Sequence, residues 1–135
     1  SQNDVERFPP GYVFAAWKRT SGRMEYIPHP IDTAAVKLPR LLVRLQEKLA
    51  EHAHEVWSAG RLADGWTFGD KRDDARKQNP CLVPYDQLPE KEKDYDRRAA
   101  METLKAILSL GYQILPPAKM VKKKTVKRAT KSKGK

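Results

Sequence analysis

The sequence has little of several features that would place a protein in a familiar class at once. It has one cysteine, Cys81, so it cannot form an internal disulfide framework, and we expect a reducing compartment. No apolar run approaches the roughly 20 residues of a membrane-spanning helix. The first residues also lack the charged and then apolar order of a signal peptide. We therefore predict a soluble, cytoplasmic protein with no membrane partner.

Signatures of catalysis and of metal binding are also scarce. There is no glycine-rich phosphate loop. The three histidines do not have a spacing, among the scattered acids, that indicates a metal site. Cys81 and His54 could be read as a nucleophile and its base, but a single cysteine before Leu82 and Val83 is more often a small buried hydrophobic residue. We predict a protein that is not an enzyme, with no cofactor and no bound metal.

Basic and acidic residues are almost equal in number except in the C-terminal segment. The net charge is +10, but residues 118–135 hold nine Lys and Arg and no acid, and residues 1–117 hold 18 basic and 17 acidic residues. The segment 118–135 has almost nothing apolar to bury, so we expect a disordered tail. Such a tail binds nucleic acid nonspecifically and with a steep salt dependence, or it is only a solubilising end. The candidate contacts are Lys122, Lys123, Lys124, Lys127 and Arg128.

Two stretches have helical periodicity. The first begins near Pro39 and ends between Gly60 and Gly65, and the second runs from about Pro89 to Leu110. Gly111 is a candidate C-cap of the second helix. The expected buried stripes are Leu38, Leu42, Leu45, Leu49, Ala53, Val56 and Gly60 in the first helix, and Leu88, Tyr95, Ala99, Ala100, Leu104, Ile107, Leu108 and Leu110 in the second.

The residues before the first helix favour extended structure. Residues 11–19 are rich in aromatic and β-branched side chains and predict a short strand or an arm. Pro28 and Pro30 exclude a helix from the segment that follows. We treat residues 1–25 as an N-terminal arm.

The segment between the helices, residues 54–85, loses its regular period after about Gly60. A globular chain of this size rarely spends some thirty residues on a structureless loop. His54, Trp57 and Arg61 share one side of the first helix, which we expect beside the buried stripe rather than within it. Trp66 then crosses in a short extended stretch, and Asn79 and Tyr85 return toward the helix. Residues 82–85 are at most an edge strand. We interpret the segment as the wall of a pocket.

Four groups of residues in fixed order resemble one known module. They are His54, Trp57 and Arg61; then Asp64-Gly65-Trp66; then Asn79-Pro80 before Leu82-Val83-Pro84-Tyr85; and finally Thr103-Leu104-Lys105 before Gly111-Tyr112. The series resembles the RyR domain, which is repeated in ryanodine-receptor calcium-release channels and occurs singly in bacterial and phage proteins. We assign residues 26–117 to it. The channel pore is absent from this sequence, so we do not expect calcium conduction.

The resemblance implies a mainly α fold, with an antiparallel two-helix core, short connecting strands and, here, the disordered basic tail. Channel copies form tandem pairs related by an approximate two-fold axis. This sequence holds one copy, so a homodimer could imitate the pair.

The resemblance also implies a ligand. A paired unit in the channels resembles an adenine-nucleotide site, and single prokaryotic copies occur beside nucleotide-signalling and anti-phage defence components. By motif, Trp57 would stack on a base, Arg61 would meet phosphate, and Asn79 would bond a base edge, with His54 lining the same pocket. Where a channel copy has a second arginine after Asn-Pro, this chain has Cys81, which implies one cationic contact fewer.

The residues support this ligand role independently but leave an alternative open. Stacking on an aromatic ring contributes about 1–3 kcal/mol per base, and arginine grips phosphate bidentately. Alternatively, Trp57 and Trp66 belong to the core, Arg61 pairs with an acid (Asp64 or Asp94), and Asn79 caps a turn. The first interpretation predicts a module that binds an adenine nucleotide or a nucleotide-derived signal. The second leaves a nucleic-acid-associated structural protein that uses the tail.

Overall fold

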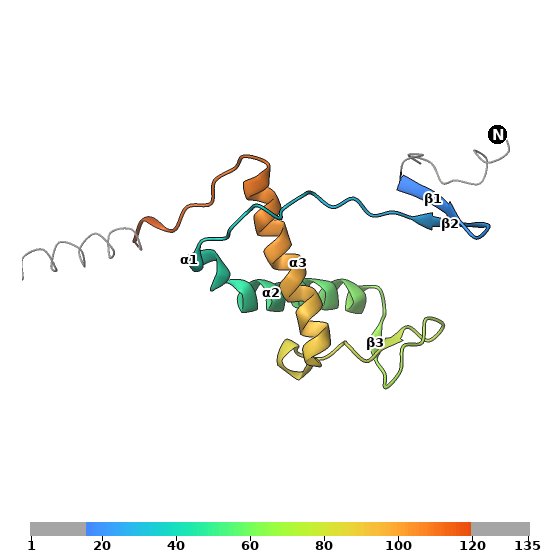
Figure 1. Cartoon of the computed structure of the whole chain (residues 1–135). Helices are drawn as coiled ribbons and strands as arrows, with labels where there is room; N and C mark the ends of the chain where they lie inside the picture. Colours follow the sequence, from blue (N-terminus) through green and yellow to red (C-terminus); the bar gives the residue numbers. More distant parts are fainter. Residues whose placement is uncertain (1–15, 120–135) are drawn as a thin grey trace, which may run out of the picture. The chain divides into compact units, whose positions relative to one another are not determined.

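The computed structural model describes residues 16–119, which fall into two compact units that divide after Asp32. The described part of the first unit holds a β-hairpin, and that of the second holds the helices (Figure 1). The described chain is mainly α-helical, as predicted. Residues 1–15 and 120–135, and with them most of the predicted arm and tail, lie outside the described residues.

The hairpin joins β1 (Trp17–Thr20) to β2 (Arg23–Tyr26) in antiparallel register. Its two turn residues, Ser21 and Gly22, have φ values of +50° and +78°. Positive φ at both positions is the requirement of a type I′ turn, whose twist matches that of the paired strands. The sequence pointed to a strand before residue 20 but not to its partner.

The first predicted helix is divided into two. Helix α1 (Arg40–Val43) ends in a turn at Arg44 and Leu45, and α2 (Gln46–Ala63) continues from there. The Leu45 N–H donates to the carbonyl of Leu42 at 3.0 Å, a tighter i to i+3 bond than an α-helix makes. Helix α3 (Glu90–Ser109) agrees closely with the second predicted helix.

Both long helices end in the same motif. Gly65 follows α2 with φ +89°, and Gly111 follows α3 with φ +93°. After α2, Gly65 donates to the carbonyl of Leu62 at 3.0 Å and Trp66 donates to that of Arg61 at 2.9 Å. This pair of bonds is the Schellman motif, which closes the free carbonyls of a last helical turn. The motif sets Trp66 beside Arg61.

The core of the second unit lies between α2 and the segment that precedes α3. In Figure 1 the orange α3 passes over the green α2 instead of running alongside it, so the two helices are not arranged as the expected antiparallel pair. Ala50 has no exposed surface and packs with Tyr85 and Leu88, which come from the segment just before α3. A residue without side-chain bulk at this point lets the two elements approach closely.

The buried stripe of α2 differs from the predicted one. Ala50 and His54 are its buried residues, whereas Leu45 is 40% and Val56 59% exposed, and Ala53 and Gly60 are exposed as well. His54 therefore lies within the core stripe and not beside it. The periodicity identified a helix, but the face that packs was set by α3 and the segment before it. On the second helix, Tyr95, Ala99 and Leu110 were also expected to be buried and are exposed.

Arg97 of α3 ties the elements together at the edge of this core. Its guanidinium donates to the carboxylates of Glu47 in α2 and of Glu90 and Asp94 in α3. Its side chain is 21% exposed, whereas those of its partners are more than half exposed. The hydrogen bonds to these carboxylates, that to Glu47 first, hold the pKa of Arg97 above its ordinary value.

The segment between α2 and α3 is compact. Strand β3 (Thr67–Phe68) pairs in parallel with β4 (Gln78–Asn79), and the predicted extended stretch after Trp66 is therefore present. A 3-10 helix, η3 (Tyr85–Gln87), starts where we expected an edge strand to end. Pro84 before it and Pro89 after it confine the chain to one short turn.

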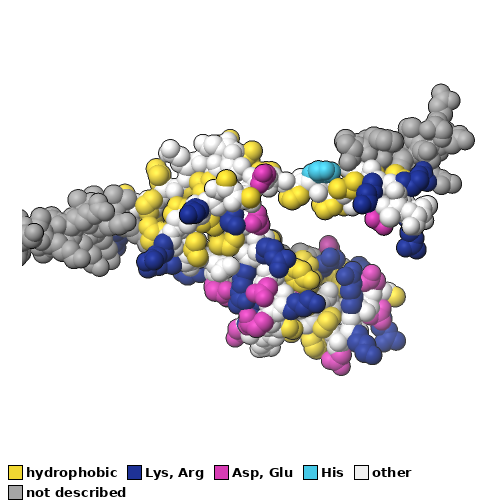
Figure 2. Space-filling view, viewed as in Figure 1, with side chains coloured by type: hydrophobic (Ala, Val, Ile, Leu, Met, Phe, Trp, Pro, Cys, Tyr) yellow, Lys and Arg dark blue, Asp and Glu magenta, His cyan; other side chains and the backbone are white. Residues whose placement is uncertain are grey.

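The surface of the described chain is mixed in character. Figure 2 shows Lys and Arg interspersed with Asp and Glu, with apolar patches between them. Among residues 16–119, no helix is both long enough and apolar enough to cross a membrane.

Candidate functional site

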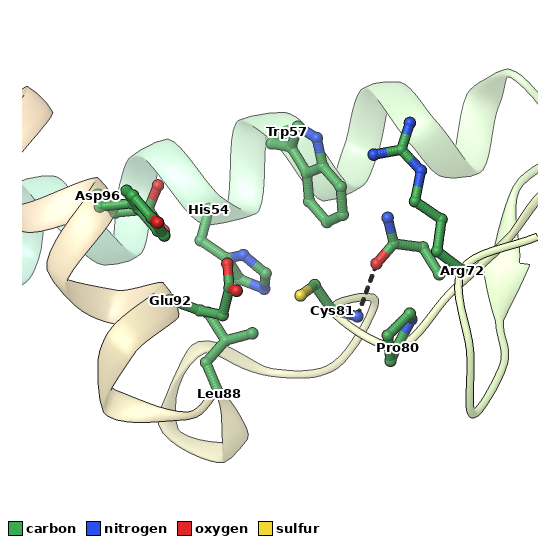
Figure 3. A pocket seen from close by; sticks show the side chains of 10 residues that line it. His54, Trp57, Arg72, Pro80, Cys81, Leu88, Glu92 and Asp96 are labelled. Carbon is green, nitrogen blue, oxygen red and sulfur yellow. Dashed lines mark hydrogen bonds between the residues drawn. The ribbon is translucent and has the colours of Figure 1, made fainter.

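A cavity of about 410 Å³ lies in the second unit, between α2, the start of α3 and the segment that connects them (Figure 3). Its volume is within the range of small-molecule sites. Its lining residues are His54, Trp57, Arg72, Asn79, Pro80, Cys81, Leu88, Glu92, Tyr95 and Asp96.

Helix α2 supplies two rings to the cavity. His54 and Trp57 are three residues apart and so share a face. Their ring centroids are 5.7 Å apart and the rings are inclined by 28°. His54 is 4% exposed, and its Nε2 donates to the carbonyl of Val83 at 2.7 Å. This bond satisfies a buried polar group and fixes the imidazole. The indole of Trp57 extends into the space between His54 and Arg72 (Figure 3).

The turn after β4 supplies an amide. Asn79 accepts a hydrogen bond from the Cys81 N–H at its Oδ1 atom, at 2.8 Å. Since this contact identifies the oxygen, the free part of the amide is its NH₂ group, which can only donate. Asn79 therefore caps a local turn and still offers donors to the cavity that it lines.

The cavity is polarised in charge. Glu92 and Asp96 lie toward one end, on successive turns of α3, and Arg72 lies at the other (Figure 3). Neither carboxylate forms an ion pair within the described part of the chain. Arg72 donates from Nε to Asp74 at 2.9 Å, which raises its pKa. Burial, and then the charges of Glu92 and Asp96, raise the pKa of the Cys81 thiol.

Three of the predicted site residues do not line the cavity. The Arg61 guanidinium lies 5.1 Å from the centroid of the Trp66 ring and 5.8 Å from that of Trp57. Arg61 thus bridges the two indoles from outside. Tyr85 is buried against Ala50 and donates its hydroxyl to Glu47 at 3.0 Å. The structure brings together His54, Trp57 and Asn79 and leaves Arg61, Trp66 and Tyr85 around them.

The alternative interpretation, in which these residues have only structural roles, agrees with the structure only in part. Trp57 and Trp66 are half-buried and do not belong to the core. Among the described residues, Arg61 has no ion pair with Asp64 or Asp94, and Asp94 pairs with Arg97 instead. Asn79 does cap a turn.

The charged residues of the lining were not among the residues predicted from the sequence. Glu92, Tyr95 and Asp96 stand at the i, i+3 and i+4 positions of one helical face, a spacing that could have grouped them. Arg72 had no such signal, because its place depends on how the loop between β3 and β4 turns back. Within the described residues, no group of three or more His, Cys, Asp and Glu could hold a metal ion.

Comparison with known families identifies this unit. The family model of the RyR domain matches residues 26–116. The chain belongs to the RyR domain family. The RyR domain contains α1, α2, α3 and every residue that lines the cavity. It begins at the last residue of β2 and excludes residues 118–135.

Proposed function

We propose that this RyR domain is a non-catalytic module that binds an adenine nucleotide, or a signal derived from one, in the cavity beside Trp57. One observation carries the proposal: an indole, an amide with only donors to offer and a guanidinium meet in one cavity of about 410 Å³. A purine needs an aromatic surface and hydrogen-bond partners for its edge, and a phosphate needs a cation.

Each group has a role in this proposal. Trp57 stacks on the base, and the NH₂ group of Asn79 donates to a ring nitrogen. Arg72 meets phosphate, and it takes the part that the sequence had given to Arg61. Arg61 is a further cation close to the stacking ring, since its guanidinium lies 5.8 Å from the centroid of Trp57.

The chemistry of the lining favours binding over catalysis. A thiol is a nucleophile only as the thiolate, and the pKa of Cys81 is raised above its usual value of 9.0. Cys81 is therefore protonated at neutral pH. His54 uses Nε2 to hold the carbonyl of Val83, which supports a structural role for its ring.

Calorimetric titration of the full chain with adenine nucleotides tests the site. Trp57→Ala should weaken binding about 5- to 150-fold, the equivalent of about 1–3 kcal/mol of stacking. Trp66→Ala is the matched control, because this indole also touches Arg61 but lies outside the cavity. Equal binding by wild type and Trp57→Ala would show that the site is misplaced.

Asn79→Asp gives a second test at the base edge. The aspartate keeps an oxygen for the Cys81 N–H but removes the NH₂ donors. Nucleotide binding should weaken. The unfolding midpoint should change no more than it does for an ordinary surface substitution.

The same proposal extends to assembly and context. The module forms tandem pairs in the channels, and we propose that this RyR domain pairs in the same way as a homodimer. We further propose that it is of the prokaryotic or phage type and acts in nucleotide signalling or anti-phage defence. Exposed apolar side chains support association, among them Val56 and Leu62 on α2. Sedimentation over a range of concentrations tests this, and a monomer at every concentration would exclude the dimer.

A second candidate function rests on the charge of residues 118–135, which hold nine Lys and Arg and no acid. We propose that this segment binds nucleic acid nonspecifically. Removing residues 118–135 should abolish a gel shift seen at low salt, because the rest of the chain is nearly neutral. Nucleic-acid binding that survives the deletion would overturn this candidate.

A further inference from the structure

The acidic end of the cavity has a consequence for the ligand. Glu92 and Asp96 are half-buried, lie one turn apart on α3, and line the cavity. Arg72 is the one Lys or Arg among the lining residues, and it is already hydrogen-bonded to Asp74. The lining therefore carries two carboxylates against one guanidinium.

This balance is unusual for a site that receives several phosphates. A phosphate monoester carries about −1.5 to −2 charges at neutral pH, and each further phosphate adds to this. Sites for polyphosphates surround the ligand with cations or backbone N–H groups. Here a second or third phosphate would meet only the guanidinium of Arg72, which already bonds Asp74, and would be repelled by Glu92 and Asp96.

The same carboxylates suit the opposite edge of a ligand. An ionised carboxylate only accepts hydrogen bonds, so it favours N–H and O–H donors. The exocyclic amino group of adenine is such a donor. A base that stacks on Trp57 with this edge toward α3 turns its sugar and phosphate toward Arg72.

Resting on the proposed nucleotide site, we infer that Glu92 and Asp96 are its specificity residues: they restrict it to ligands of low phosphate charge, an adenine nucleoside or its monophosphate, and exclude the triphosphate. The carboxylates act in two ways, by accepting from the amino edge of the base and by repelling additional phosphate.

Titration of the full chain with adenosine, AMP, ADP and ATP measures the restriction directly. In the wild type, affinity should fall along the series from AMP to ATP, by about tenfold for each added like charge near the acids. The double variant Glu92→Gln/Asp96→Asn keeps the shape of both side chains and removes their charge. In this variant the order from AMP to ATP should flatten or reverse.

A control separates local from overall charge. Asp70→Asn/Asp86→Asn removes the same number of negative charges from two exposed positions that do not line the cavity. This variant should keep the wild-type order of affinities. If it shifts the order as much as Glu92→Gln/Asp96→Asn does, the effect is one of net charge and the inference is wrong.

Cys81 gives a second readout, since it is the only thiol of the chain. Burial, and then the charges of Glu92 and Asp96, raise the pKa of this thiol. Removing the two charges in Glu92→Gln/Asp96→Asn should therefore make Cys81 react faster with iodoacetamide at a fixed pH. AMP should protect the thiol in the wild type. Protection by ATP equal to that by AMP would contradict the restriction.

The outcomes distinguish the two proposals. If ATP binds the wild type as tightly as AMP does, and the double variant leaves the order unchanged, the inference fails and the nucleotide site stands. If no member of the series binds the wild type, the nucleotide site fails and the inference falls with it.

Discussion

Single residues decide which face of α2 is buried. Ala50 has no exposed surface and packs with Tyr85 and Leu88, whereas Ala53, one turn further along α2, is exposed. The sequence pattern favoured Ala53 as the buried residue, because it continues the series from Leu42 and Leu49. Both residues are alanine, so neither size nor polarity marks which of them is buried.

Substitution of each alanine tests this register. Ala50→Leu should lower the free energy of unfolding by about 1–3 kcal/mol, because the added carbons have no space between α2 and the Tyr85–Leu88 segment. Ala53→Leu, on the same helix, should change it by less than about 0.5 kcal/mol. Urea unfolding followed by circular dichroism measures both, and the reverse order would show that the sequence-based stripe is the buried one.

At the scale of elements, the helix ends follow the sequence most closely. Gly65 and Gly111 both stand where a left-handed residue closes a helix. The motif after α2 turns Trp66 back against Arg61, and this holds the guanidinium outside the cavity.

Two glycines of the α2 region should respond in opposite ways to alanine. Gly65→Ala should cost about 1–2 kcal/mol, because its φ of +89° is unfavourable for a residue with a Cβ. Gly60→Ala should stabilise by about 0.5–1 kcal/mol, since Gly60 lies within α2 and an added Cβ meets no atom within 4 Å. Thermal unfolding of the two variants provides the comparison. Destabilisation by both would contradict the assigned end of the helix.

At the scale of the whole second unit, one cation joins α2 to α3. The guanidinium of Arg97 holds the pKa of Glu47 and that of Glu90 below the ordinary value of 4.5. The hydroxyl of Thr33 lowers the pKa of Glu102 in the same direction. A carboxylate whose pKa is lowered on folding contributes stability above its unfolded pKa and loses it as the pH falls through the folded pKa.

The unfolding free energy should therefore stay nearly constant from neutral pH down to about 5 and decrease below about 4.5. Arg97→Gln should be less stable at pH 7 and should lose less on acidification, because Glu47 and Glu90 then titrate nearer their ordinary values. Denaturant unfolding at a series of pH values compares the two. Parallel curves would mean that Arg97 does not set the acid sensitivity.

Some residues of the candidate site could be predicted from the sequence and others could not. His54 and Trp57 could be grouped from the sequence, because two residues three positions apart on a helix share a face. Asn79 was grouped with them through the family motif and not through spacing. Arg72 could not be found, since the turn between β3 and β4 places it, and this turn depends on the pairing of Thr67 with Gln78.

The sequence by itself determined the presence of two helical stretches, the extent of the second, their glycine ends and membership of the RyR domain family. These features depend on residues within one or two turns of each other, or on motifs in fixed order. Only the tertiary structure decided that Ala50 packs against Tyr85 and Leu88, that His54 is buried, and that Glu92 and Asp96 line the same cavity as Arg72. These placements depend on contacts between residues that are distant in the chain. The bond from His54 to the carbonyl of Val83 is one of them, and no local pattern encodes such a contact.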